Sequence, residues 1–121
     1  MKVCVTSQGK SLDAQVDPRF GRCPYFIIAD TDTMEFEAVQ NPNVTGMGGV
    51  GVQSGQFMSE KKVKVVLTGN VGPNAFRTLE AAEIAVITGV SGSVKEAIER
   101  YKSGELKLSD GASVNSKFGM G

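Results

Sequence analysis

Short runs of apolar, often β-branched residues are separated along this chain by polar segments that contain glycine, proline or aspartate. Such runs are typical of strands, because branched and aromatic side chains pack well on a pleated sheet. They predict strands at Val3–Thr6, Pro24–Ala29, Met34–Val39, Lys64–Thr68 and Ile84–Ile87. The third run alternates apolar residues with glutamates, and only a turn separates it from the second. These two strands are therefore expected to form an antiparallel hairpin whose outer strand is half-exposed.

Segments with helical character lie between the later strands. Gly49–Lys61 is one candidate helix, although its glycines make it weak in isolation. A second helix is expected to open at Pro73, because proline suits the first helical position. A third is expected after Ser93, which has the spacing of a capping box with Glu96. The range 105–108 is a candidate for brief strand pairing.

The predicted order, β-β-β-α-β-α-β-α, favours an α/β domain of three layers. Alternating strands and helices imply parallel strands with right-handed crossovers, and the hairpin adds an antiparallel member. The expected sheet is therefore mixed and five-stranded with three helices, an arrangement similar to the ribonuclease H-like group. Its fourth and fifth strands should be buried on both faces. The carboxyl ends of the first and fourth strands should face a crevice lined by 7–23, 43–51 and 69–74.

Composition fits one soluble domain. The chain has 121 residues, of which 40% are hydrophobic and 21% charged, and its thirteen basic residues balance thirteen acidic ones. This balance predicts neither nucleic acid nor a membrane surface as a partner, and the first residues do not resemble a signal peptide. We expect a domain over 1–108, a mobile Gly/Ser-rich tail over 109–121, and a cytoplasmic location.

Histidine is absent, and the only cysteines are Cys4 and Cys23. The chain therefore lacks the residues for a histidine-based catalytic triad, for a His-containing zinc site or for a four-cysteine metal site. The first and fourth predicted strands carry no acidic residue, which argues against two-metal nuclease chemistry in a fold of this topology.

A glycine cluster at 46–51 matches the Gly-x-Gly-x-x-Gly spacing of dinucleotide sites. Such a site needs the glycines directly between a strand and its helix, and an acidic residue at the end of the next strand. Here a spacer precedes the glycines, and the next strand ends in Leu67–Asn70. The pattern thus predicts no NAD or FAD. Gly48 and Gly49 remain candidates for a flexible loop or for an anion-binding nest at a helix start.

The most unusual segment is 17–26, Asp-Pro-Arg-Phe-Gly-Arg-Cys-Pro-Tyr-Phe, which closes a long polar connection. In one interpretation the segment is structural: Asp17 pairs with an arginine, Phe20 covers the end of the sheet, and Cys23 is a small buried hydrophobic side chain. In the other it is an anion site, where Arg19 and Arg22 supply charge and Cys23 a thiolate. The residues alone leave both open.

This segment resembles the signature of the dinitrogenase iron–molybdenum cofactor biosynthesis family, the NifX type that also forms the C-terminus of the NifB type. Stretches at 48–51, 65–75 and 86–94 agree with it in order, so the resemblance covers roughly 1–104. It implies a ribonuclease H-like fold and a non-catalytic role in binding or carrying metal–sulfur clusters or their precursors. Small stand-alone members of the family also occur in organisms that fix no nitrogen.

The implied cargo is an iron–sulfur or iron–molybdenum–sulfur cluster, with cluster donor and acceptor proteins as partners. Some family carriers hold clusters through histidine, so any protein ligand here must be a cysteine, a methionine or an oxygen group, and Cys23 is the candidate metal ligand. A cluster can also be held by charge and backbone N–H groups alone. The expected cofactor-binding residues are Arg19, Phe20, Gly21, Arg22, Cys23, Gly48, Gly49, Gly69, Asn70 and Gly72. The alternatives are an enzyme that binds a small anion such as phosphate, and a protein-interaction module.

Overall fold

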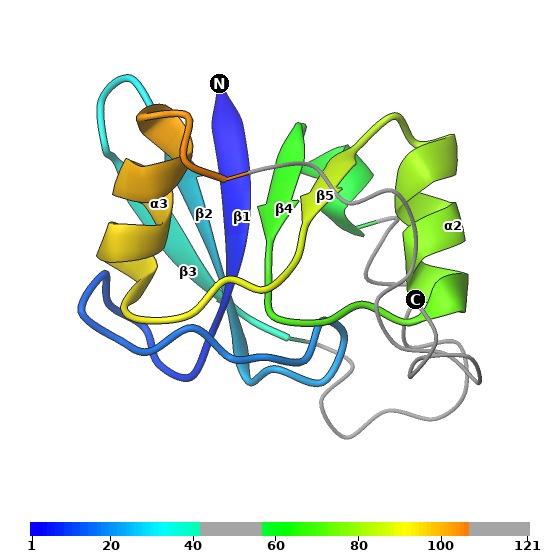
Figure 1. Ribbon diagram of the computed structural model, residues 1–121, viewed down its shortest axis with the longest axis horizontal. Coiled ribbons are helices and arrows are strands. Elements are labelled where there is room, and N and C mark those ends of the chain that lie inside the picture. Colours follow the sequence, from blue (N-terminus) through cyan, green and yellow to red (C-terminus); the bar gives the residue numbers. More distant parts are fainter. Residues whose placement is uncertain (42–56, 107–121) are drawn as a thin grey trace.

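The computed structural model describes residues 1–41 and 57–106 (Figure 1). Five strands form one sheet: β1 (Lys2–Ser7), β2 (Tyr25–Asp30), β3 (Phe36–Gln40), β4 (Val65–Leu67) and β5 (Ala85–Ile87). The helices are α2 (Pro73–Ala81), between β4 and β5, and α3 (Val94–Lys102), after β5. Residues 57–60, between β3 and β4, are also helical, so the expected order of elements is confirmed.

The sheet has the strand order β3-β2-β1-β4-β5. The hairpin strands are antiparallel to their neighbours, with Cys4 opposite Ile28 and Ile28 opposite Glu37. In contrast, β4 runs parallel to β1, and β5 runs parallel to β4. The predicted mixed five-stranded sheet is confirmed. The carboxyl ends of β1, β4 and β5 therefore meet at one edge of the sheet.

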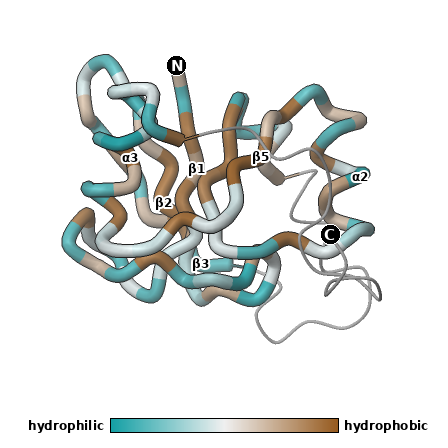
Figure 2. Tube along the Cα trace, viewed as in Figure 1, coloured by the Kyte–Doolittle hydropathy of each residue, from teal (hydrophilic) through white to brown (hydrophobic). Residues whose placement is uncertain are grey.

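Each face of the sheet carries its own apolar core, so the domain has three layers. Leu79 of α2 joins one core together with Phe26 and Val66. Ile98 of α3 joins the other with Val5 and Leu67. Figure 2 shows hydrophobic residues concentrated along the strands, between the two helical layers. All of β4 is buried, as are two of the three residues of β5, so the expectation that both strands are covered on each face is met.

Local sequence explains where the two helices begin. The Ser93 hydroxyl accepts from the Glu96 N–H at 3.1 Å, and the Glu96 carboxylate accepts from the Ser93 N–H at 3.0 Å. This is the capping box that the sequence predicts for α3. In α2, proline occupies the first turn as expected, and the N-cap residue is Gly72, which has no side chain to cap the helix.

Several sequence expectations change or fall outside the described residues. Residues 57–60 are helical, and the remainder of the candidate helix from Gly49 is not described, nor is the expected tail over 109–121. Glu105 and Leu106 are not in a strand, so the described part of 105–108 does not pair. The third strand starts at Phe36 rather than Met34, because Met34 has φ 63 and belongs to the turn. Among the described residues, no helix is long and apolar enough to span a membrane.

Candidate functional site

Two of the three segments expected to meet at the carboxyl edge of the sheet do so. The long connection after β1 and the turn after β4 pair through a bridge between Arg19 and Asn70. The Asn70 N–H donates to the Pro18 carbonyl at 2.7 Å, and the Phe20 N–H donates to the Asn70 carbonyl at 3.2 Å. The third segment, 43–51 with Gly48 and Gly49, lies outside the described residues. Figure 1 shows the two described loops running side by side below the sheet.

Gly69 allows this close approach. A Cβ at Gly69 would lie 2.6 Å from Pro18 Cα and 3.0 Å from the Pro18 carbonyl oxygen, closer than side chains pack. Any larger residue would therefore push the two loops apart. The role of Gly69 seen here is to let one backbone lie against another.

The connection is anchored to the sheet by buried polar groups. The Thr6 hydroxyl donates to the Asp17 carbonyl at 2.6 Å and lies 2.9 Å from the Thr68 hydroxyl. The Asp17 N–H in turn donates to the Thr6 carbonyl at 2.9 Å. Thr6 and Thr68 are fully buried at the ends of two parallel strands. The start of the 17–26 segment is thereby fixed to the sheet edge.

Asp17 is buried and holds Arg19 with a two-pronged contact. The Arg19 Nε and Nη2 atoms donate to the two Asp17 carboxylate oxygens, each at 3.1 Å, and the Arg19 N–H donates to Oδ1 at 2.8 Å. These hydrogen bonds, followed by the carboxylate charge, raise the pKa of Arg19. The side chain is nevertheless 59% exposed, so its guanidinium remains at the surface. The pairing of Asp17 with an arginine was one of the two interpretations of this segment, and it is present.

Arg22 differs from Arg19 in its contacts. It is exposed and makes no hydrogen bond or ion pair with any residue in the ranges 1–41 and 57–106. A further cation, Lys10, stands 5.6 Å from the centre of the Tyr25 ring at the same edge of the sheet. Within the ranges that the structure describes, Arg22 and Lys10 are therefore the cations of this edge that make no ion pair with a carboxylate.

Phe20 and Gly21 shape the turn that presents these arginines. Phe20 is buried, and its ring centre lies 5.8 Å from that of Phe26, so it closes the end of one apolar core. Gly21 has φ 91, a left-handed conformation that favours glycine. The Asn41 amide donates to the Gly21 and Cys23 carbonyls at 3.0 and 2.9 Å, which fixes the turn from the end of β3.

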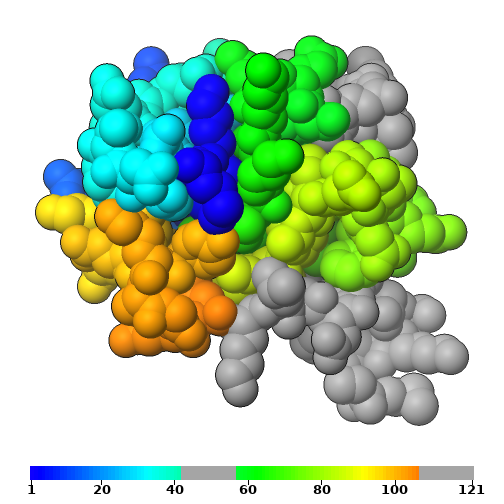
Figure 3. Space-filling model, turned by 90° about the horizontal axis from the view of Figure 1, so that it is seen from above, coloured from blue at the N-terminus to red at the C-terminus, as the bar shows by residue number. Residues whose placement is uncertain are grey.

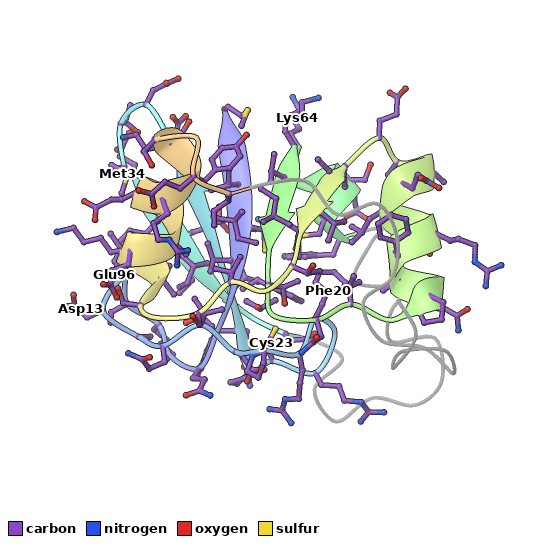
Figure 4. The ribbon with its side chains drawn as sticks, in the orientation of Figure 1. Asp13, Phe20, Cys23, Met34, Lys64 and Glu96 are labelled. Atoms are coloured by element: carbon purple, nitrogen blue, oxygen red, sulfur yellow. The ribbon has the colours of Figure 1, made fainter. Side chains whose placement is uncertain are left out.

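Cys23 lies inside the molecule. Its side chain is fully buried, and burial together with the charge of Asp17 raises the pKa of its thiol to about 12. Cys4 is also fully buried, and burial raises the pKa of its thiol well above the usual value. Both thiols are protonated at neutral pH in this conformation. Figure 4 places Cys23 and Phe20 at the loop end of the sheet, away from Lys64.

The start of α2 adds backbone donors to this edge. Gly72 follows Asn70 by two residues, and a Cβ at Gly72 would meet no atom within 4 Å. The first turn of α2 has no side-chain cap and no acidic residue. Its N–H groups thus keep the partial positive charge of a helix N-terminus, which attracts anions. By contrast, Glu96 satisfies the first turn of α3 from within the chain.

Sequence reasoning missed three polar residues of this edge: Asn41, Thr6 and Thr68. The two threonines directly follow apolar strand residues, so both were expected to be buried. A buried hydroxyl needs a hydrogen-bond partner, and this is the signal that could have identified them. Asn41 follows the edge strand and gives no comparable signal. No group of three or more His, Cys, Asp or Glu side chains in the described parts of the chain is placed to hold a metal ion. The described residues at this edge offer guanidinium, ammonium and backbone N–H groups, which are groups that attract anions.

Solved structures with the same architecture include two at substantial identity. The apo form of the orange protein from Desulfovibrio gigas matches with a TM-score of 0.89 and 37% identity, over 92% of this chain and 94% of that one. A NifB-like protein from Thermotoga matches with a TM-score of 0.75 and 38% identity, over 88% and 91% of the two chains. An uncharacterised protein of Methanocaldococcus jannaschii is 29% identical over 96 residues, which are 77% of this chain and 81% of that one.

The family described as dinitrogenase iron-molybdenum cofactor matches residues 1–104. That range contains every described strand and helix, so the match extends over the whole fold. Together with the NifB-like neighbour, it supports a role in biosynthesis or binding of this cofactor. The chain belongs to the dinitrogenase iron–molybdenum cofactor family.

Proposed function

We propose that this protein binds and carries an anionic metal–sulfur cluster, the iron–molybdenum cofactor or a related precursor, without catalysing a reaction. The cargo would lie against the loop edge of the sheet, beside Arg19, Arg22 and the first turn of α2. The relative called the orange protein has an apo form, meaning a form without its bound group, which supports a binding role for this fold.

The observation that carries the proposal is that the cationic connection after β1 and the turn after β4 meet beside an uncapped helix start. Main-chain hydrogen bonds between Pro18, Phe20 and Asn70 hold the loops together before any cargo arrives. A preorganised site loses less conformational entropy on binding than one that must assemble. Exposed Arg22 and the α2 N–H groups then face an anion without first giving up a protein partner.

The burial of Cys23 bears on how the cargo would be held. A bond from its sulfur to a metal would require the 21–24 turn to open and the thiol to lose its proton, against a pKa of about 12. Contacts from arginines and N–H groups require neither. We therefore expect charged groups and backbone donors to supply most of the affinity for the cargo. The Cys23→Ser variant below tests separately whether a bond from Cys23 to a metal contributes.

The test is anaerobic incubation with iron–sulfur, thiomolybdate and iron–molybdenum–sulfur preparations, followed by desalting, metal and sulfide analysis and a visible spectrum. Arg22→Gln should weaken binding at least tenfold, since a hydrogen bond to a charged group contributes about 1.5–3 kcal/mol. Lys64→Gln removes an exposed cation from the opposite end of the molecule and is the matched control (Figure 4). Cys23→Ser should retain the cargo.

Each outcome has a distinct meaning. Stoichiometric cargo that is lost in Arg22→Gln but kept in Lys64→Gln supports the proposed site. Loss in Cys23→Ser with a folded protein would assign the cluster to a thiolate bond instead. Retention of inorganic phosphate in place of every metal–sulfur preparation would favour a small-anion site. Binding equally weakened by both cation variants would contradict a localised site.

A further inference from the structure

The outer strand β3 offers a second feature, separate from the loop edge. In the described part of the chain, β3 pairs on one side only, with β2, and it is the last strand of the sheet. Figure 3 shows the β2–β3 hairpin, in cyan, at the outer surface of the molecule. An edge strand of this kind is a template for pairing with another strand.

The hydrogen-bond pattern tells which β3 groups face outward. The Asp30 N–H donates to the Glu35 carbonyl at 2.8 Å, and the Asn41 N–H donates to the Pro24 carbonyl at 2.9 Å. Because main-chain groups in an antiparallel ladder alternate in direction, the odd-numbered residues from 35 to 41 bond to β2. The N–H and carbonyl groups of Phe36, Ala38 and Gln40 therefore point away from the sheet.

The side chains of β3 do little to prevent another strand from pairing with this edge. Phe36 is 42% exposed, one of two large hydrophobic side chains that the structure leaves exposed among the described residues. The charge of Glu37, which would oppose association, is paired with Lys61, whose Nζ lies 3.0 Å from the carboxylate. The strand thus combines outward-facing backbone groups, an exposed aromatic ring and a reduced net charge.

A second copy of β3 fits this edge in one register. With Ala38 opposite Ala38 of the second copy, Phe36 faces Gln40 and Glu37 faces Val39. This register forms about six main-chain hydrogen bonds, two for each of three outward-facing pairs. Shifting it to centre on Glu37 places two glutamates directly opposite each other, which is destabilising. Shifting it to centre on Val39 removes Phe36 from the ladder.

We propose that two copies of this chain associate through antiparallel pairing of their β3 strands, centred on Ala38, to form one continuous sheet. The interface is small, so the dimer is in rapid exchange with the monomer, with a Kd on the order of 100 μM. In this arrangement the two carboxyl edges point in opposite directions, because the paired β3 strands are antiparallel. Both loop edges stay open, and the inference does not depend on what they bind.

The first test is concentration-dependent hydrogen exchange on the whole chain, followed by NMR. The amides of Phe36, Ala38 and Gln40 should exchange about fourfold more slowly at 1 mM than at 20 μM for a Kd of about 100 μM. Those of Glu37 and Val39 already bond to β2 and should not change. Equal rates at both concentrations, or slowing confined to another surface, would overturn the proposal.

The second test is sedimentation of two variants at the same position. Ala38→Pro removes an outward N–H that β2 does not use, and proline is accepted on edge strands. Ala38→Thr keeps that N–H. At 1 mM, wild type and Ala38→Thr should approach twice the monomer mass of 12.8 kDa, whereas Ala38→Pro should stay monomeric. Association of folded Ala38→Pro to the same extent as wild type would rule out β3 pairing. Should Ala38→Pro fail to fold, the exchange pattern of the wild type decides.

Discussion

Substitution of Gly72 separates the stability of this protein from its proposed binding role. Gly72 is the N-cap of α2, with φ −79 and ψ 169, an extended conformation open to any residue. A Cβ there would meet no atom within 4 Å, so Gly72→Ser and Gly72→Asp introduce side chains without a clash. Both can accept a hydrogen bond from the first turn of α2, but only aspartate adds a negative charge.

The two variants should be more stable than wild type by different amounts. Replacing glycine at a compatible site and adding a cap should raise the free energy of unfolding by about 0.5–1 kcal/mol for Gly72→Ser. The aspartate charge at the helix N-terminus should add about 0.3–1 kcal/mol for Gly72→Asp. Urea denaturation of cargo-free protein measures both values.

Binding should respond in the opposite direction. A charge at Gly72 lying roughly 8 Å from each negative charge of the cargo costs about 0.5–2 kcal/mol at an effective dielectric constant between 80 and 20. Gly72→Asp should therefore bind an anionic cluster about 2- to 30-fold more weakly for each negative charge at that distance, while Gly72→Ser stays close to wild type. A Gly72→Asp protein that is more stable yet binds equally well would refute a cargo position at the start of α2.

Three other substitutions test the structure around this edge. Gly69→Ala should lower the free energy of unfolding by about 1–3 kcal/mol in urea denaturation, since its Cβ would overlap Pro18, and an unchanged midpoint would contradict that packing. Asp17→Asn should cost about 1–2 kcal/mol in the same assay, because it replaces the buried carboxylate that binds the Arg19 guanidinium by a neutral amide, whereas exposed Asp13→Asn should change stability by less than about 0.5 kcal/mol. The raised thiol pKa of Cys23 means that the folded state keeps a proton which the unfolded chain releases near pH 9. Cys23 should thus contribute a fall in stability of about 1.4 kcal/mol per pH unit from about pH 9 upward, beside the fall caused by buried Cys4. Cys23→Ala should remove the Cys23 contribution alone, and identical pH profiles for the two proteins would disprove the assignment.

The fold was predictable from the sequence because its signals are local. Apolar runs fix the strands, Pro73 marks the start of α2, and Ser93 with Glu96 marks the start of α3. The alternating order of strands and helices then restricts the topology to few arrangements. Strand boundaries were less predictable where the conformation of one residue decides them. Met34 has a positive φ and belongs to the turn, so β3 starts two residues later, at Phe36.

The site was predictable only in part, because its supports join residues distant in sequence. Thr6 and Thr68 are 62 positions apart, and Asn41 lies 20 positions from the carbonyl of Gly21 that it holds. No local sequence pattern predicts hydrogen-bond partners that are so far apart along the chain. The same limit applies to Cys23, where the sequence allowed both a buried side chain and a ligand. Its burial and the nearby charge of Asp17 are consequences of tertiary packing.

The structural interpretation of the 17–26 segment is confirmed in part by the structure, and it is compatible with the anion site proposed above. Asp17, Phe20 and Cys23 are buried and form its structural part. Because they tie the loop to the sheet, Arg22 is presented on a rigid turn instead of a freely moving one. Asp17 also neutralises much of the Arg19 charge, so the net attraction for an anion rests on Arg22, Lys10 and the α2 N–H groups. A carrier must release its cargo, and a site with few uncompensated charges and no exposed thiolate favours release over permanent retention.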